Sequence, residues 1–314
     1  MADPENIFLP SLKELRERNA NAICPEVAWI WGPNDEVGRL NLLTGKLISK
    51  VVKEEVQSGC VVSLNWNMEL PAHPNFDRSP CKFKILPNPS SDCIFDDILE
   101  MNIQSGSQWD GFRHFGHLTH GFLYNNLSPK DVMLTNRCGM HVISRRGIVG
   151  RDVFLDYYRY SQKFNKLYDP FTSHAITLNE LLSCANYQGT RFQKGDILII
   201  RSGYVSRYHQ LQKSDPAELE RSAASNPTLA GVEQSEEMKT WLHDSVSSYF
   251  AAVAGDAPSF EVWPSSQSWY LHEYLLACWG VMIGEMFDLE VKLHFRPLFY
   301  FRCLLNISGS IGSM

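Results

Sequence analysis

The chain contains the run Gln104-Ser-Gly-Ser-Gln108-Trp-Asp110-Gly-Phe-Arg-His114-Phe-Gly-His117. It combines carboxylate, imidazole and amide side chains with chain-bending glycines, a combination typical of an active-site segment. Asp110 can supply a hard oxygen ligand and His114 a titratable base, while Gln104 and Gln108 can bind a substrate or, weakly, a metal. A surface loop with incidental polar residues is the alternative interpretation. A second segment, far down the chain, favours the active site.

That second segment is His272-Glu-Tyr-Leu-Leu-Ala-Cys-Trp-Gly-Val-Met-Ile-Gly-Glu285. Its apolar residues recur at helical spacing, which predicts a helix that begins near His272 and ends at Gly280. Residues 281–287 form an apolar run that predicts a buried strand carrying Glu285. A buried His or Glu is costly to desolvate unless it is paired or bound to a metal. Taken alone, a histidine such as His272 is more often a hydrogen-bonded core residue than a ligand, but a Glu in a buried strand needs a partner.

The first segment resembles the signature His-x-Gly-Thr-His-x-Asp-x-Pro-x-His of the metal-dependent cyclase family, which includes bacterial kynurenine formamidases and isatin hydrolases. On this motif Asp110 matches the Asp and His114 the last His, whereas Phe112 stands at the Pro. Gln104 and Gln108 occupy the two positions that are metal-binding His in the hydrolases. The form Gln-Trp-Asp-Gly-x-Arg-His resembles a branch of the family common among fungal proteins.

The resemblance extends along most of the chain, with further blocks in family order at residues 31–44, 147–156, 194–203 and 253–264. His272 and Glu285 fall where the family has its distal metal-binding His and Glu. The resemblance therefore implies a divalent metal held by Asp110, His272 and Glu285 with help from Gln108 or His117. This oxygen-rich set favours Mn²⁺ or Mg²⁺ somewhat more than Zn²⁺.

The two Gln replacements leave a metal-free site open as well, because an amide oxygen is a weak ligand beside an imidazole. Without a metal, Asp110, His114, His272 and Glu285 would form an acid–base cluster suited to dehydration, isomerisation or ring closure. Trp109 and Phe112 flank Asp110 in the sequence and predict an apolar wall for a flat, aromatic or polyketide-like substrate. His117 is a further candidate for substrate contact.

Composition excludes several other classes of protein. The chain has 314 residues, 44% of them hydrophobic, a net charge of −6 and a pI of about 5.9, without a basic run that would bind nucleic acid. It has no apolar run of signal-peptide or membrane-spanning length, so we expect a cytoplasmic protein. The eight cysteines lack a Cys-x-x-Cys pair, which predicts reduced thiols. Nucleophile-elbow, Walker A and Gly-x-Gly-x-x-Gly motifs are absent from the sequence.

Strand and helix patterns alternate along the chain, which predicts an α/β or α+β fold. The resemblance implies the swivelling β/β/α fold of the cyclase family, with a β-barrel-like core flanked by helices. We expect an N-terminal arm over residues 1–30 and a catalytic domain over 31–314. The individual predictions are helices at 11–18, 44–57, 178–185 and 235–250, strands at 60–64, 197–201 and 251–254, a long loop at 70–91 and a surface insertion at 214–228.

These features support three functions. The first is a cyclase-family hydrolase that acts on a C–N or C–O bond (amide, lactam, lactone or ester) of a small aromatic or polyketide-like compound. The second is a metal-independent dehydratase or cyclase of secondary-metabolite biosynthesis. The third is a non-catalytic binding protein on the same fold, although a dead site has no physical reason to bury four ionisable groups. By analogy with the family we expect a homodimer.

Overall fold

The structure is a computed structural model that describes residues 9–57, 59–244, 249–290 and 300–303. Its helices and helical turns are α1 (Leu12–Arg18), η1 (Gly38–Leu42), α2 (Gly45–Glu55), η2 (Tyr124–Asn126), α3 (Pro129–Leu134), α4 (Met140–Arg146), α5 (Tyr157–Lys163), α6 (Leu178–Gln188), α7 (Tyr204–Ser214), α8 (Pro216–Ser222), α9 (Glu236–Asp244) and η3 (Glu273–Cys278). Its strands are β1 (Lys82–Pro87), β2 (Phe95–Glu100), β3 (Gln108–Asp110), β4 (Ile148–Leu155), β5 (Ala175–Ile176), β6 (Ile197–Ile200), β7 (Gly231–Val232), β8 (Ala252–Gly255), β9 (Met282–Glu285) and β10 (Tyr300–Cys303).

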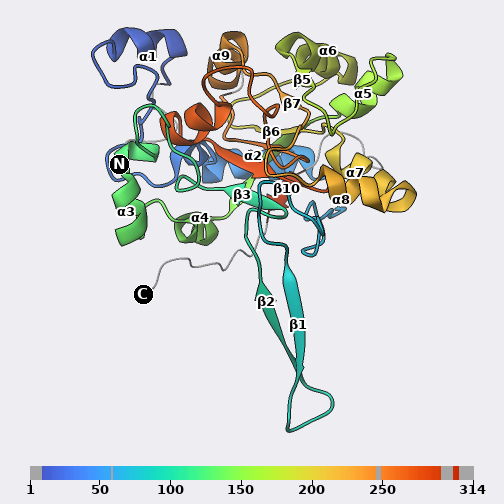
Figure 1. The fold of residues 1–314 in the computed structure, drawn as a ribbon. Coiled ribbons are helices and arrows are strands. Elements are labelled where there is room, and N and C mark those ends of the chain that lie inside the picture. The colour runs from blue at the N-terminus through green and yellow to red at the C-terminus, as the bar shows by residue number, and fades with distance from the viewer. Residues whose placement is uncertain (1–8, 58, 245–248, 291–299, 304–314) are drawn as a thin grey trace.

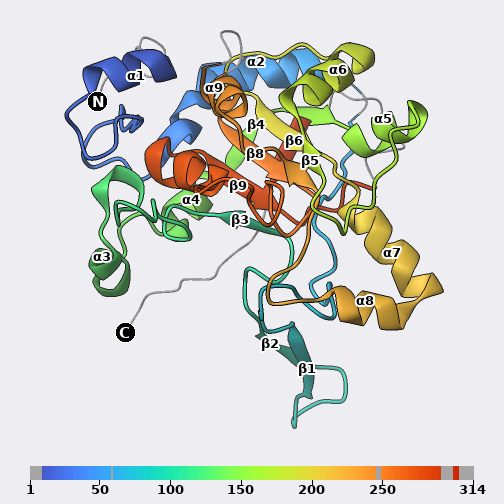
Figure 2. The same cartoon turned by 45° about the horizontal axis from the view of Figure 1, so that its top comes forward.

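A six-stranded sheet in the order β10-β4-β6-β8-β9-β3 forms the centre of the molecule. Strands β4, β6, β8 and β9 run parallel, and the edge strands β10 and β3 are antiparallel to their neighbours. The central strands β6 and β8 are wholly apolar and buried because helices cover the sheet, as Figures 1 and 2 show for α5, α6 and α9. The mixed α/β class is confirmed. The described strands form a sheet with two distinct edges, so a barrel-like core stays a prediction.

The helices predicted from local signals are present, whereas α3, α4, α7 and α8 were not predicted. Ser11 and Thr177 each accept a backbone N–H and complete a capping box at the start of α1 and α6, and Thr44 caps α2. The helix at His272 also exists and continues as a π-helix through Cys278, followed by Gly280 at φ +64°. The predicted helix at 235–250 is observed as α9, and residues 245–248 lie outside the described residues.

Two sequence predictions were wrong. Residues 60–64 are not a strand, and the next residue, Asn65, makes only an isolated bridge with Phe287. The predicted loop at 70–91 contains β1, which pairs with β2 in an antiparallel hairpin. The surface insertion at 214–228 stays a prediction, and it contains helix α8, which Asp215 caps.

The hairpin of β1 and β2 projects from the body, away from α6 and α9 (Figure 1). Its strands are exposed on both faces, although they carry large apolar side chains. The exposed apolar residues on these two strands are Phe83, Ile85, Phe95, Ile98 and Leu99. A two-stranded hairpin exposed on both faces is marginally stable alone in water, so it calls for a covering partner.

The N-terminal arm packs onto the body. Leu12 and Leu15 of α1 belong to the same buried cluster as the central strands, and Tyr249 donates a hydrogen bond to the carbonyl oxygen of Pro10 at 2.7 Å. These contacts do not test where the arm ends, so the boundary between arm and catalytic domain at residue 30 stays a prediction. Among the described residues, no helix combines the length and apolarity needed to cross a membrane.

Candidate active site

Strands β3 and β9 bring the two sequence segments together. They pair antiparallel, with Gln108 opposite Glu285 and Asp110 opposite Ile283. Side chains of directly opposite residues share a face of the sheet, and residues two apart along a strand do so too. Gln108, Asp110 and Glu285 therefore lie on one face at the edge of the sheet.

His272 joins this face from the start of the helix before β9. Its Nε2 atom lies 3.3 Å from Oε1 of Glu285 and 3.7 Å from Oδ2 of Asp110. One ligand atom from each of the three residues falls within 4.8 Å of the other two, and all three residues are buried. The convergence expected for Asp110, His272 and Glu285 is thus present.

Glu261 fixes the orientation of His272. Its Oε1 atom accepts hydrogen bonds from Nδ1 of His272 at 2.7 Å and from the backbone N–H of His272 at 2.9 Å. Its Oε2 atom accepts from Leu271 N and from Nε2 of Gln234, both at 2.7 Å. Because Nδ1 of His272 is bound to Glu261, Nε2 is the ring nitrogen that faces Asp110 and Glu285. Sequence reasoning missed Glu261, which lies inside the quoted 253–264 block but has no spacing that links it to His272.

The two glutamines act as hydrogen-bond donors to the carboxylates. Nε2 of Gln104 donates to Oδ1 of Asp110 at 2.7 Å. Nε2 of Gln108 donates to Oε2 of Glu285 at 3.0 Å and to Oε1 of Gln104 at 3.1 Å. The two amides therefore donate hydrogen bonds to the carboxylates from the positions at which the hydrolase motif has metal-binding imidazoles.

Two buried oxygens at this point have no hydrogen-bond donor among the described residues, Oδ2 of Asp110 and Oε1 of Gln108. A buried polar atom without a partner is costly, which favours a ligand at that point. Oδ2 of Asp110 also faces Nε2 of His272. An oxygen-rich donor set with one imidazole and an unsatisfied carboxylate oxygen fits a divalent cation.

Burial and neighbouring charges shift the pKa values of Glu285 and His272. Burial and the charge of Asp110 raise the pKa of Glu285 to about 7. Burial alone would lower the pKa of His272, but the neighbouring carboxylates of Asp110, Glu261 and Glu285 raise it well above its usual value. The group thus holds a proton between its carboxylates and imidazole at neutral pH, and a cation would have to displace that proton.

His114 stands at the solvent side of the group. Its Nε2 atom lies 3.9 Å from Oδ2 of Asp110, and its side chain is 26% exposed, whereas that of Asp110 is fully buried. Burial lowers the pKa of His114, and the charge of Asp110 opposes this shift only in part. A neutral imidazole beside a carboxylate and open to solvent can accept a proton from a bound molecule.

The remaining predicted residues lie elsewhere. Trp109 is on the opposite face of β3 and packs edge-on against Phe287, with ring centroids 5.3 Å apart. Phe112 is buried against Tyr124 at 4.4 Å. Both are positions of core side chains, the usual fate of an aromatic residue. His117 belongs to a separate group, so substrate contact by Trp109, Phe112 and His117 stays a prediction.

One solved structure shares this fold, and two others are similar at a lower level. The crystal structure of a novel cyclase matches with a TM-score of 0.71 at 23% identity, over 86% of this chain and 90% of that chain. Isatin hydrolase A from Labrenzia aggregata, bound to benzyl benzoate, gives a TM-score of 0.49 at 13% identity over 76% and 85% of the two chains. Isatin hydrolase A from Ralstonia solanacearum gives 0.47 at 11% identity over 75% and 81%.

No curated protein matches the chain by sequence. The family model described as "Putative cyclase" matches residues 44–262, which is more than half of the chain and includes Gln104, Asp110, His114 and Glu261. With the fold shared by the cyclase structure, this match shows that the chain belongs to the cyclase family.

Proposed function

We propose that this cyclase-family chain is a hydrolase of a C–N or C–O bond in a small aromatic or polyketide-like amide, lactam, lactone or ester. The observation that carries the proposal is the convergence of buried Asp110, His272 and Glu285 with His114 on the solvent side. Such a group can bind a carbonyl compound at the surface and move a proton beside it.

Asp110, His272 and Glu285 would hold a divalent ion, with Mn²⁺ or Mg²⁺ favoured somewhat over Zn²⁺ because carboxylate oxygens predominate. Such an ion would polarise a substrate carbonyl and lower the pKa of a bound water. Glu261 orients the ring of His272 so that Nε2 faces the two carboxylates. Gln104 and Gln108 keep those carboxylates in place by donating to them.

His114 is the general base of the proposed reaction. Its lowered pKa keeps the imidazole neutral near pH 7, so it can accept the proton of an attacking water. Its partly exposed side chain makes the proton exchangeable with solvent. Asp110 beside it stabilises the imidazolium that forms.

A second candidate is a metal-independent dehydratase or cyclase, and the glutamine contacts favour it. Gln104 and Gln108 donate to Asp110 and Glu285, and burial with the charge of Asp110 raises the pKa of Glu285 to about 7. In this reaction Glu285 and His114 would exchange protons with the substrate, and no activated water would be needed.

Turnover measured with and without metal separates the two. The purified chain would be freed of metal with a chelator and assayed on lactones, lactams, aryl esters and N-formyl anilines, before and after Mn²⁺, Mg²⁺ or Zn²⁺ is added. Hydrolysis that appears only with added ion and disappears in Asp110→Asn supports the hydrolase. Hydroxylated and open-chain aromatic or polyketide-like precursors are assayed in the same way for loss of water or ring closure. Dehydration or ring closure that survives metal removal supports the second candidate. Inactivity on the hydrolysis substrates counts against the first candidate, and inactivity on the precursors counts against the second.

The exposed hairpin supports a homo-oligomer. Four of the five exposed apolar side chains of β1 and β2 share one face of the hairpin, and a second copy of the chain would cover it. Light scattering tests this by comparing the chain with a variant that carries Ile85→Lys and Ile98→Lys. A monomeric wild-type chain would contradict the proposal.

A further inference from the structure

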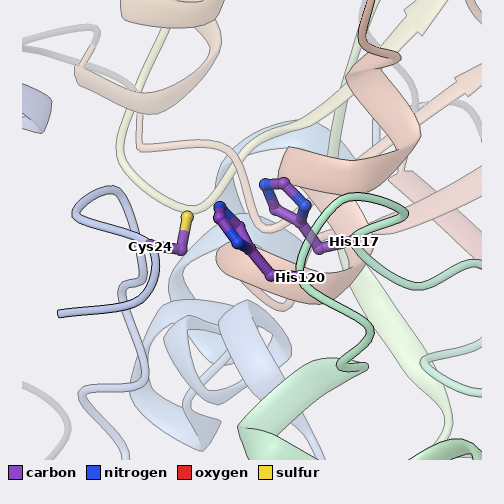
Figure 3. A group of neighbouring side chains, drawn as sticks. All are labelled: Cys24, His117 and His120. Carbon is purple, nitrogen blue, oxygen red and sulfur yellow. The ribbon is translucent and has the colours of Figure 1, made fainter.

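A cavity of about 620 Å³ lies between the N-terminal coil and the loop at residues 117–122, away from the face that carries Asp110. Cys24, His117 and His120 line it, together with Trp269 and Tyr274. One ligand atom from each of Cys24, His117 and His120 lies within 4.8 Å of the other two. Figure 3 shows the two imidazoles on one loop, with the Cys24 sulfur beside the ring of His120.

The loop that carries both histidines is held by its own backbone. The N–H of His117 donates to the carbonyl oxygen of Phe122 at 2.7 Å, and the N–H of Gly121 donates to that of His117 at 2.8 Å. Gly121 adopts φ +70°, a conformation that favours glycine and closes the turn. The ring centroids of His117 and His120 are 4.5 Å apart. The two imidazoles are therefore placed together before any ligand binds.

Glu273 stands behind His117 in the position of a carboxylate that orients a metal-ligating histidine. Its Oε1 atom lies 3.5 Å from Nδ1 of His117 and accepts the backbone N–H of Leu118 at 2.7 Å. Oε2 of Glu273 accepts the N–H of Tyr270 at 2.8 Å, so the carboxylate is fixed on both sides. Nδ1 of this buried histidine has no hydrogen-bond partner among the described residues. A proton on Nδ1, directed at Glu273, would leave Nε2 as the ligand atom.

The geometry points to a second metal site, in which Cys24, His117 and His120 bind a Zn²⁺-class ion and leave its fourth position open to the cavity. One thiolate and two imidazoles are borderline-soft ligands that suit Zn²⁺ better than Mg²⁺ or Mn²⁺. Three protein ligands beside a cavity leave room for an exchangeable water or small anion, whereas a closed structural site uses four.

This site is distinct from the Asp110 group, although two neighbouring residues at the start of one helix contribute one to each group. His272 turns toward Asp110 and Glu285, and the next residue, Glu273, turns toward His117. The two groups differ in chemistry, since one offers mainly carboxylate oxygens and the other sulfur and nitrogen. They should accordingly select different ions.

The test uses the full chain with Asp110→Asn, which disables the first group. Zn²⁺ is titrated by calorimetry and Co²⁺ by absorption, because a cobalt–thiolate bond gives a charge-transfer band that an oxygen and nitrogen site lacks. We expect about one equivalent of either ion and a thiolate band. Adding Cys24→Ser should abolish the band and weaken Zn²⁺ binding by on the order of 100-fold, whereas Glu273→Gln should weaken it roughly 10–100-fold.

The matched control is Cys278→Ala, because the Cys278 sulfur lies 3.8 Å from that of Cys24 but is fully buried. This variant should keep both the band and the affinity. If Cys24→Ser does not fold, His120→Ala on the surface loop takes its place and should also weaken binding. An Asp110→Asn protein that binds no Zn²⁺, or unchanged binding after loss of Cys24 or His120, would overturn the proposal. Neither result bears on catalysis at Asp110, which the assays above decide separately.

Discussion

Nδ1 of His272 lies 2.7 Å from Oε1 of Glu261, a glutamate with no exposed surface. This contact determines which nitrogen of His272 faces Asp110 and Glu285. It makes Glu261 a positioning residue, because it acts on the site through His272.

Replacing Glu261 with Gln should weaken divalent-metal binding at the Asp110 group roughly 10–100-fold, because the imidazole loses its orienting carboxylate. Calorimetry with Mn²⁺ measures this. Glu180→Gln makes the same chemical change at the capping box of α6 and should leave the affinity unchanged. Equal affinities for the wild type and Glu261→Gln would show that His272 is held by its other contacts.

His114→Ala should lower kcat by roughly 10²-fold or more with the fold intact, as expected for loss of a positioned general base. Because burial lowers the pKa of His114 from its ordinary value of 6.5, the base stays neutral as pH falls, and the acid limb of kcat/KM should lie below pH 6.5. The measurement is a pH–rate profile on a substrate found in the assay panel. Near-normal turnover by the variant would remove His114 from the mechanism.

Converting Gln104 and Gln108 to His should raise divalent-metal affinity, since two imidazoles would replace amides that donate to Asp110 and Glu285. It should not improve the native reaction if this branch has diverged in chemistry. Metal titration and turnover of the double variant test both parts. Stoichiometric zinc that survives dialysis of the native chain against a chelator, in a Cys24→Ser background, would instead indicate an ordinary family hydrolase.

The protein's free energy of unfolding should decrease at acid pH because of His243. It is fully buried between Tyr249 and Trp279, and burial lowers its pKa to about 4. Between about pH 6.5 and 4 the unfolded chain binds a proton at this position that the folded chain does not, so stability rises with pH across this window. The loss on acidification is on the order of 3 kcal/mol.

Denaturant unfolding at several pH values checks this. His243→Gln should show a shallower decline from pH 6.5 to 4 than the wild type. The exposed His73→Gln is the control and should follow the wild-type curve. Parallel curves for wild type and His243→Gln would mean that other groups cause the acid sensitivity.

The sequence predicted those parts of the fold that depend on local signals. Ser11, Thr44 and Thr177 are caps, and caps act within one helical turn. The resemblance to the cyclase motif located Asp110, His272 and Glu285, and the structure brings them together. Hairpin β1–β2 was missed because it lies in a stretch rich in Pro, Asn, Asp and Ser, and the alternation in β1 covers only residues 82–85.

Contacts between distant segments could not be predicted. Glu261 meets His272 only because the chain folds back before the helix at 273–278. Cys24 reaches His117 and His120 only because the N-terminal coil packs on the loop that follows the motif. Neither Glu261 nor Cys24 lies at a distance along the sequence that links it to its histidine. No motif therefore marks any of the scattered cysteines as a candidate metal ligand.

The central claim is that Asp110, His272 and Glu285 form one divalent-metal site. The most direct test is calorimetric titration of Mn²⁺ into a Cys24→Ser, His120→Ala chain, compared with the same chain carrying Asp110→Asn or Glu285→Gln. We predict one equivalent of Mn²⁺, an affinity that rises with pH as the ion displaces the shared proton, and loss of binding in both carboxylate variants. Mn²⁺ binding that is absent, or that persists unchanged in the two variants, would contradict the account.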